Sequence, residues 1–283
     1  MGARVAVVIP TFNRPHELGQ AVRSVLSQVD VELDVVVVDD GDSRGELGGV
    51  LADDRVRVVV TPRPGSGEAA ARNAGLESVT APWIAFCDDD DLWHPRKLVT
   101  QLAAADGVGW MACGNASFWV TRAGRPVVCA VSPSVSADEI LAQLRRRGGI
   151  PGGASGVMAR TDLVRDAGGY RDLSIGADWD LWLRLADRAP VGVVPERVVA
   201  VRLHPRSVTA DARRLRRGMD DVAALHTGSD GSLQVVPDVE SHFRWYAQAA
   251  SRAGQGRLAM SFQSDVAKHS GRARDWLLAV AML

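Results

Sequence analysis

The chain has 283 residues, of which 46% are hydrophobic and 24% charged, which is the composition of an ordinary globular protein with a substantial core. Its 33 Lys and Arg nearly balance its 34 Asp and Glu, and the formal net charge of −1 excludes a global field that would attract nucleic acid or an anionic membrane. No stretch approaches the roughly 18 apolar residues of a membrane span, and the 3 separated cysteines lack metal-binding spacing, which indicates a reducing, cytoplasmic location.

The first third of the chain alternates between predicted strands and predicted helices. Runs rich in Val and Ile predict strands buried on both faces, at residues 5–9, 33–38, 56–60 and 83–86. Helices are predicted to begin at Pro15, to span residues 67–76 after the flexible "PGSG", and to begin at Pro95. This order predicts an α/β fold in which helices cover both faces of a doubly wound, mostly parallel sheet.

The middle and the end of the chain are less regular. Further strands are predicted at residues 108–120, 125–132 and 198–204, helices at 137–147, 161–167 and 178–189, and a glycine-rich loop at 147–157. From Pro205 the sequence is rich in arginine and helical in pattern, and its apolar end at residues 276–283 predicts a packed terminal helix. We therefore divide the chain into a domain at residues 1–205, with halves at 1–105 and 106–205, and a helical C-terminal extension at 206–283.

Three of the predicted parallel strands end in polar segments. The first continues into "PTFNR", residues 10–14, the second into "DDGDS", residues 39–43, and the fourth into the aspartates at 88–91. Because ligands of open α/β sheets bind beyond the carboxyl ends of the strands, these segments are expected to converge on one crevice. Their convergence predicts a functional site.

The adjacent aspartates, Asp88 to Asp91, repel one another unless water, cations of the protein or a bound metal offset their charge. Hard divalent cations such as Mg²⁺ and Mn²⁺ prefer carboxylate oxygens, and such a cation would screen a diphosphate. The alternative is an exposed acidic loop in which one aspartate caps the following helix. The position at a strand end favours the metal site.

Asp39 and Asp40 follow the second strand, where an acidic residue of a nucleotide-binding sheet contacts the ribose or the base. An ordinary turn before Gly41 would use the same residue types. The first strand leads into "PTFNRPHE", which lacks the glycine fingerprint of nicotinamide-binding proteins, and the sequence has no P-loop. The sequence therefore argues against these two kinds of nucleotide site.

Taken together and in order, the segments "VVIPTFNRP", "VVVVDDGDS", "AARNAGL", "IAFCDDDDLWHPRKL" and "GADWDLWLRL" resemble the motifs of the inverting family-2 glycosyltransferases of GT-A fold. The resemblance extends from about Arg4 to about Thr209. It implies a Rossmann-like GT-A domain over residues 1–205, with a nucleotide-binding and an acceptor-binding half. It also implies transfer of a sugar from a nucleotide diphosphate donor, most commonly a UDP-sugar, to a hydroxyl or similar nucleophile, with Mn²⁺ or Mg²⁺.

The resemblance also implies roles for individual residues. The residues expected to line the donor nucleotide are Pro10, Thr11, Phe12, Arg14, Asp39, Asp40, Arg72, Asp88 and Asp89. The expected metal ligands are Asp88, Asp90 and His204, with Asp90 as the direct ligand. A lone histidine is also commonly structural, so His204 has that alternative.

An inverting transfer needs a general base that takes the proton of the acceptor. The resemblance gives this role to Asp178 in "ADWDLW", although Ala177 stands where the family usually has Glu. Asp180 is the alternative base, and its place inside the predicted helix favours a structural role. Asp178 could also act only as a helix cap.

Acceptor contacts are expected from residues 148–169, whose glycine-rich loop "GGIPGGASG" could fold over the donor. The acceptor itself is not readable: a glycan, a lipid-linked molecule and a small molecule all stay open. The arginine runs at 145–147 and 213–217 are ordinarily solvated helix faces, and the second is a candidate contact with an anionic acceptor or a membrane surface. The C-terminal helices are a candidate dimer surface.

Two further functions stay open. The chain could be a catalytically inactive, nucleotide-binding relative, although its acidic groups are intact. It could also be a Mg²⁺-dependent phospho-acceptor signalling module, since receiver domains place an acidic crevice on a doubly wound sheet. Those domains are far shorter, and their acidic pair follows the first strand and not the second, which disfavours this alternative.

Overall fold

The computed structural model describes residues 3–41, 52–120, 125–147, 150–204, 211–227, 235–270 and 272, without the side chains of residues 147 and 269. The end of the "DDGDS" segment at residues 42–43 and the apolar end at 276–283 lie outside the described residues.

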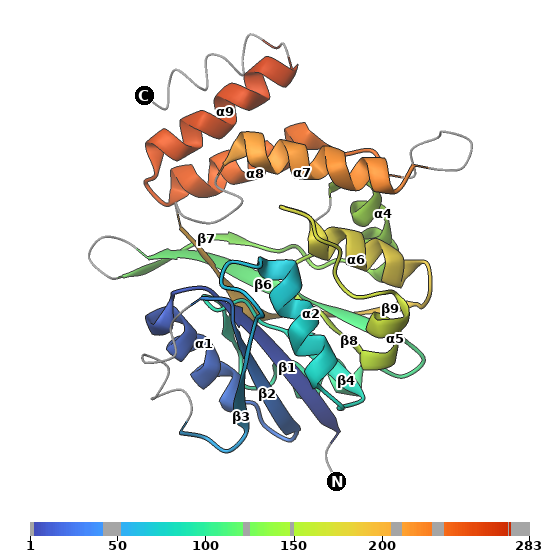
Figure 1. Ribbon diagram of the computed structural model, residues 1–283. Helices are drawn as coiled ribbons and strands as arrows, with labels where there is room; N and C mark the ends of the chain where they lie inside the picture. Colours follow the sequence, from blue (N-terminus) through green and yellow to red (C-terminus); the bar gives the residue numbers. More distant parts are fainter. Residues whose placement is uncertain are drawn as a thin grey trace.

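The described strands form one mixed sheet of nine strands (Figure 1). Its parallel half has the order β3 (Val56–Val60), β2 (Glu32–Asp39), β1 (Arg4–Thr11) and β4 (Trp83–Phe86). The sheet continues with β8 (Met158–Arg160), antiparallel to its neighbours β4 and β6 (Trp110–Val120), and then with β9 (Val191–Leu203), parallel to β6. Two antiparallel strands complete it, β5 (Leu92–Trp93) on β9 and β7 (Pro126–Val131) on β6.

The parallel half is buried on both faces, as the valine-rich runs predict. Along β1, Val5, Val7 and Ile9 belong to one buried apolar cluster, whereas Ala6 and Val8 belong to another on the opposite face. The first cluster packs under α1 (Pro15–Leu26) and α3 (Lys97–Ala103). The second packs under α2 (Glu68–Ser78), α5 (Thr161–Asp166) and α6 (Ala177–Ala186), and extends to α4 (Ala137–Arg147). This is the doubly wound arrangement expected from the sequence.

The register of the parallel strands sets the polar segments side by side. Thr11 of β1 is paired with Asp39 of β2, and Val8 of β1 with Phe86 of β4. The residues after Phe86 therefore run beside the end of β1. Three strand ends reach one edge of the sheet, as predicted.

The C-terminal helices α7 (Ala212–Leu225), α8 (Val239–Arg252) and α9 (Gly256–Ser270) gather above one end of the sheet in Figure 1. The buried side chains of α7, among them Leu215 and Val222, belong to the same apolar cluster as Val8 of β1. A Cβ on Gly218 would come within 2.7 Å of Ile175, so α7 approaches the chain just before α6 very closely. The boundary at residue 205 stays a prediction, and the apolar core is continuous across it.

The structure departs from the predicted elements in four places. The sheet is mixed in its second half, because β8 inserts antiparallel between β4 and β6. The strands β8 and β5 were not predicted, because they are too short to show a sequence period. The predicted strand at 198–204 is the second half of β9, which begins at Val191. The helix expected at Pro95 begins at Lys97, after a turn in which the Lys97 N–H donates to the His94 carbonyl.

All three cysteines, Cys87, Cys113 and Cys129, are buried and free. None of the helices in the described part of the chain has both the length and the apolar character needed to cross a membrane. The cytoplasmic location stays a prediction from composition.

Candidate functional site

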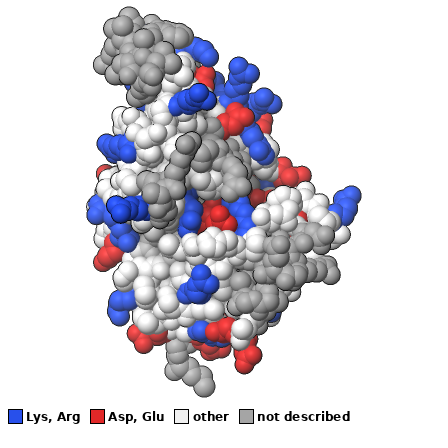
Figure 2. Space-filling view, turned by 90° about the vertical axis from the view of Figure 1, so that its left-hand side faces the viewer, with Lys and Arg blue, Asp and Glu red and all other residues white. Residues whose placement is uncertain are grey.

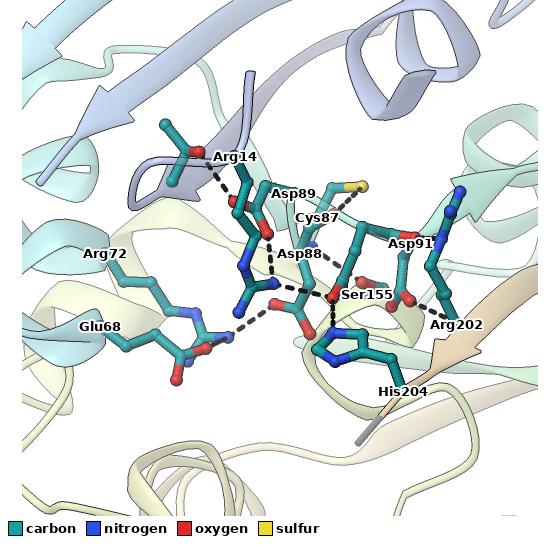
Figure 3. A network of polar contacts seen from close by, with 12 residues as sticks. Arg14, Glu68, Arg72, Cys87, Asp88, Asp89, Asp91, Ser155, Arg202 and His204 are labelled. Carbon is teal, nitrogen blue, oxygen red and sulfur yellow. Dashed lines mark hydrogen bonds and ion pairs between the residues drawn. The ribbon is translucent and has the colours of Figure 1, made fainter. Parts of the chain in front are cut away.

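Acidic side chains gather in a hollow at the carboxyl ends of the parallel strands, with basic side chains on either side (Figure 2). Figure 3 shows the network that they form. Most of these carboxylates contact one of two arginines, Arg14 or Arg72. Arg14 comes from the loop after β1, and Arg72 comes from the first turns of α2.

The Arg14 cluster consists of Thr11, Arg14, Asp89, Asp90 and His204. The guanidinium of Arg14 lies 3.1 Å from an Asp89 oxygen and 2.9 Å from an Asp90 oxygen. The Thr11 hydroxyl donates to the other Asp89 oxygen at 2.7 Å, and His204 Nε2 lies 2.8 Å from Asp90 Oδ2. The end of β1, the aspartate run and the end of β9 are thereby joined by charge-assisted contacts.

The Arg72 cluster consists of Glu68, Arg72, Asp88, Tyr170 and Asp178. One guanidinium nitrogen of Arg72 lies 2.5 Å from Glu68 and 2.8 Å from Asp88, and the other lies 3.4 Å from Asp178. The guanidinium also lies over the Tyr170 ring, 5.2 Å from its centroid. A single buried arginine thus meets carboxylates from α2, from the strand end and from α6.

The "AARNAGL" segment explains why Arg72 is held so firmly. Asn73 exchanges two 2.8 Å hydrogen bonds with the backbone of Tyr170, which fixes the ring under Arg72. Gly75 faces the sheet where a Cβ would clash with Val8, so α2 packs directly on β1. The Arg72 side chain is only 1% exposed.

Asp91 is directed away from both arginines. One of its oxygens accepts the Arg202 backbone N–H at 3.0 Å, and its carboxylate also bonds to the Ser155 hydroxyl. Ser155 in turn accepts the Asp88 N–H at 3.0 Å, and the Arg202 side chain donates to the Asp90 carbonyl at 3.1 Å. Asp91 therefore anchors the aspartate run in the protein and leaves the other three aspartates for the site.

Burial and mutual repulsion make the cluster reluctant to carry its full negative charge. Burial, and then the charges of neighbouring carboxylates, raise the pKa of Asp88, and the pKa of Asp89 is raised to about 6, chiefly by burial. Arg72 lowers the pKa of Glu68, whereas the charges of Asp88 and Asp178 raise it. A positive ligand would relieve this repulsion.

In the described residues no group of three or more His, Cys, Asp or Glu side chains is arranged to hold a metal ion. The donor types nevertheless fit a divalent cation. The imidazole of His204 is already in contact with the Asp90 carboxylate, and Asp88 lies close enough for its pKa to be raised by the Asp90 charge. Mn²⁺ and Mg²⁺ take carboxylate oxygens, and Mn²⁺ also accepts imidazole. The assignment of these three ligands stays a prediction.

Asp178 and Asp180 lie two positions apart on α6 in opposite surroundings. Asp178 is 30% exposed and has the single long contact to Arg72. Asp180 is fully buried, and its oxygens accept from Arg171 at 2.9 Å, from Arg184 at 2.6 Å and from His226 at 3.0 Å. Burial raises the pKa of Asp180, but the hydrogen bonds from His226 and Arg184 and the charges of Arg184 and Arg171 outweigh it and lower the pKa. Only Asp178 has an oxygen that an acceptor could reach.

Two of the expected nucleotide contacts, Asp39 and Asp40, are buried and hydrogen-bonded within the protein. Asp40 is used by the protein, because its oxygens accept from the Thr61 hydroxyl at 2.7 Å and from the Ser66 and Gly67 N–H groups at 2.8 Å. Asp40 therefore shapes the loop into α2. The neighbouring Asp39 is also buried and accepts the Gly41 N–H at 2.9 Å.

Of the predicted nucleotide contacts in and just after the end of β1, Phe12 is exposed, whereas Pro10 and Thr11 are enclosed by the protein. Phe12 is 52% exposed at the rim of the hollow, so its ring is available to a base or sugar. Pro10 lies inside the sheet opposite Val38, and Thr11 is occupied by Asp89. Asn13 adopts a positive φ of 53°, which turns the chain so that Arg14 faces the aspartates.

Most of the described part of the glycine-rich loop is buried, and its Ser155 contacts the aspartate run. Its residues form η1 (Gly153–Gly156), where Ala154, Ser155 and Gly156 are buried, and the Gly156 carbonyl accepts from Gln101 at 2.9 Å. The expectation that this loop folds over the donor does not fit residues 150–156. Residues 148–149 lie outside the described residues.

The arginine run at 213–217 lies on the C-terminal helices. Three of its residues, Arg213, Arg216 and Arg217, line a cavity of about 460 Å³ with Lys268 of α9. Arg216 also pairs with Asp220 at 3.1 Å. None of these side chains belongs to the Arg14 cluster or the Arg72 cluster.

Sequence reasoning missed Glu68, Tyr170, Ser155 and Arg202. Glu68 was the easiest of the four to predict from the sequence, because it precedes Arg72 by four residues on a predicted helix and such pairs face each other. The other three reach the site only through the tertiary fold. No sequence pattern signalled them.

Residues 6–116 match the family model described as glycosyl transferase family 2. Among curated proteins, an uncharacterized glycosyltransferase of Rickettsia conorii is 25% identical over 202 residues, which cover 71% of this chain and 33% of that protein. The glucosyltransferase WfgD of Escherichia coli, described as UDP-Glc:alpha-D-GlcNAc-diphosphoundecaprenol beta-1,3-glucosyltransferase, is 33% identical over 101 residues, 35% of this chain and 40% of WfgD. The matched region is about a third of the length of the first of these relatives.

Solved structures share the fold over nearly the whole chain. TarS of S. aureus, residues 1–349 in complex with UDP-GlcNAc, superposes with a TM-score of 0.64 at 16% identity, over 98% of this chain and 79% of that one. The mannosyltransferase PcManGT of Pyrobaculum calidifontis, in complex with GDP-Man and Mn²⁺, gives a TM-score of 0.58 at 18% identity, over 99% and 79%. The fold expected from the sequence, GT-A with helices on both faces and a helical C-terminal part, is confirmed.

Proposed function

Because residues 6–116 match the family model described as glycosyl transferase family 2 and the described chain has the GT-A fold, we propose that this protein is a metal-dependent, inverting glycosyltransferase. It moves a sugar from a nucleotide diphosphate donor to a hydroxyl or similar nucleophile of an acceptor. UDP-sugar is the proposed donor, since TarS was solved with UDP-GlcNAc and WfgD is described with UDP-Glc. GDP-Man, bound by PcManGT, is the first alternative.

One observation carries the proposal. Asp178 of α6 and Asp88 of the strand end contact the same Arg72 guanidinium, although 90 residues separate them in the sequence. The fold thereby joins a partly exposed carboxylate to the acidic hollow at the strand ends, where a donor diphosphate would lie. That pairing of a base with a donor site is what a displacement at the anomeric carbon requires.

The donor diphosphate would bind at the Arg14 cluster and the neighbouring Asp88. Asp88, Asp90 and His204 would hold the divalent cation, which when bound supplies positive charge to the departing diphosphate. Arg14 would lie beside the same phosphates, since its guanidinium already spans Asp89 and Asp90. Phe12 and Asp39 are the proposed contacts to the nucleoside.

The acceptor end would work through Asp178. Its carboxylate would accept the acceptor's proton as the nucleophile attacks the anomeric carbon on the face opposite the diphosphate, so that the configuration inverts. Asp180 is not proposed as the base, because Arg171, Arg184 and His226 occupy its oxygens and it is fully buried. Its contacts with Arg171 and His226 instead hold α6 in position.

The other candidate functions have less support. A phospho-acceptor receiver module places its acidic pair after the first strand, whereas β1 here ends at Thr11 and the loop after it supplies Arg14. An inactive relative would not need the reachable carboxylate of Asp178. Acceptor identity, a dimer through the C-terminal helices and peripheral association with a membrane stay predictions.

Calorimetric titration of the purified chain with UDP, dTDP and GDP, in Mn²⁺ and in EDTA, tests the donor site, and donor hydrolysis tests turnover. We expect micromolar binding of one nucleoside diphosphate that weakens at least tenfold in EDTA, because the metal screens the diphosphate. Asp90→Ala should weaken binding in Mn²⁺ and make it independent of EDTA. Acetyl phosphate in the same titration tests the phospho-acceptor alternative.

Tight nucleotide binding that is the same in Mn²⁺ and EDTA would contradict the metal dependence. Nucleotide binding without any donor hydrolysis or transfer would favour the inactive relative. Absence of nucleotide binding under every condition would overturn the proposed function.

A further inference from the structure

Glu68 has no role in the function proposed above, yet it makes the shortest contact in the Arg72 cluster. Its carboxylate lies 2.5 Å from the Arg72 nitrogen that also meets Asp88 at 2.8 Å. The Asp178 contact, on the other nitrogen, is longer at 3.4 Å. Glu68 and Asp88 therefore hold one arm of the guanidinium, and Asp178 is held more loosely by the other.

The position of Glu68 differs from that of an ordinary helical ion pair. Arg72 is buried and Glu68 is 54% exposed, so the carboxylate closes the guanidinium off at the open side of the cluster (Figure 3). The Arg72 Nε is buried without a hydrogen-bond partner in the described residues, so the two terminal nitrogens alone carry its polar contacts. Moving the guanidinium would change all three carboxylate contacts together.

We propose that Glu68 is a positioning residue for the transfer reaction: together with Asp88 it holds the Arg72 guanidinium in place, so that Asp178 is oriented by Arg72 but not closely paired with it. This inference rests on the proposed function, because it assigns Asp178 the role of base. Without the Glu68 charge, Asp88 alone would hold that nitrogen, and the guanidinium could turn toward Asp178, the carboxylate on its other nitrogen. A closer Arg72–Asp178 pair would turn the base away from the acceptor and make it less ready to take a proton.

The substitution Glu68→Gln keeps the size of the side chain and removes its charge, and Glu68→Asp keeps the charge on a shorter side chain. Glu77→Gln is the matched control, because Glu77 is exposed near the other end of the same helix. For each variant, kcat and KM for donor hydrolysis and the Kd for the nucleoside diphosphate would be measured with Mn²⁺. Thermal unfolding of each variant shows whether the fold is retained.

We expect Glu68→Gln to lower kcat by at least about tenfold, the size of effect that a small misplacement of a reacting group produces, while KM and Kd stay within about twofold. Glu68→Asp should recover most of the lost kcat, and Glu77→Gln should behave as the unsubstituted chain. A merely structural ion pair would lower the melting temperature and leave kcat unchanged.

An unchanged kcat in Glu68→Gln would overturn the inference. An equal loss in kcat and in nucleotide affinity would also overturn it, since Glu68 would then act on the donor. If the unsubstituted chain shows no turnover with any donor, the proposed function fails first, and this inference fails with it.

Discussion

The two arginine clusters hold similar groups in different ways. Arg14 comes from a loop, its side chain is 33% exposed, and its partners Asp89 and Asp90 each keep a second polar partner, Thr11 and His204. Arg72 comes from a helix, is 1% exposed and bridges three elements of the fold. An exposed arginine can move aside for an incoming cation or phosphate, whereas a buried one serves as framework. The difference supports the proposal that Arg14 contacts the donor and that Arg72 fixes the position of Asp178, the proposed base.

The largest expected effect separates catalysis from donor binding. Asp178→Asn should lower turnover about 10²- to 10⁴-fold, as loss of a general base does, with nucleotide affinity unchanged. Asp172→Asn, an exposed aspartate before α6, is the control. Rates and nucleotide affinities measured on the same preparations check this. Full activity of Asp178→Asn would remove Asp178 as the base, and a matching loss of nucleotide affinity would move it to the donor site.

Protein stability gives the second test of the difference between the clusters. Arg72→Met should lower the free energy of unfolding by about 3 kcal/mol, because the Arg72 side chain is 1% exposed and its guanidinium joins α2, the strand end and α6. Arg14→Met should lower it by only about 1 kcal/mol, because Arg14 is partly exposed and Asp89, whose pKa is about 6, can take up a proton more readily than an ordinary carboxyl. Urea unfolding of both variants measures the difference. Equal losses would mean that both arginines are framework residues.

Much of the site was predictable because it is built from consecutive residues at strand ends. The strand ends at Thr11, Asp39 and Asp88 lie together as the parallel order requires, and the "AARNAGL" segment is recognisable from its residues alone. Contacts that arise only in the tertiary structure were not readable. The use of Asp40 by Thr61 and the contact of Arg72 with Asp178 depend on loops and on packing across the sheet.

The mixed second half of the sheet shows the same limit. β8 has only the residues Met158–Arg160, and its direction is set by its neighbours β4 and β6. A short strand gives no period from which to predict it, and a parallel neighbour cannot be told from an antiparallel one by composition alone.

The buried Lys97 extends the contrast, because no carboxylate pairs with it among the described residues. It lies over the Trp93 ring at 3.9 Å and donates to Gln101 at 2.8 Å. Burial lowers its pKa from 10.5 to about 8. The folded chain therefore loses this proton at lower pH than the unfolded chain, so the Lys97 contribution to stability rises between about pH 8 and pH 10.5, by at most about 3 kcal/mol.

Lys97→Met should remove this contribution. We expect the difference in the free energy of unfolding between the unsubstituted chain and Lys97→Met to grow in favour of the unsubstituted chain from about pH 8 to pH 10.5, a window set by the two pKa values. Using the difference cancels the titration of groups that both chains share. A flat curve for Lys97→Met would contradict the lowered pKa.

The close approach of α7 to α6 bears on how the chain can be shortened. Gly176, with φ of 88°, precedes α6 and lies where a Cβ would meet Val222 of α7, and His226 at the end of α7 reaches the buried Asp180 at 3.0 Å. Truncation at residue 205 would remove the helix that packs beside α6 and would leave the buried Asp180 carboxylate without its His226 partner. A fragment bounded by the family match at residues 6–116 would end inside β6 and lack α6 altogether, and with it Asp178, the proposed base.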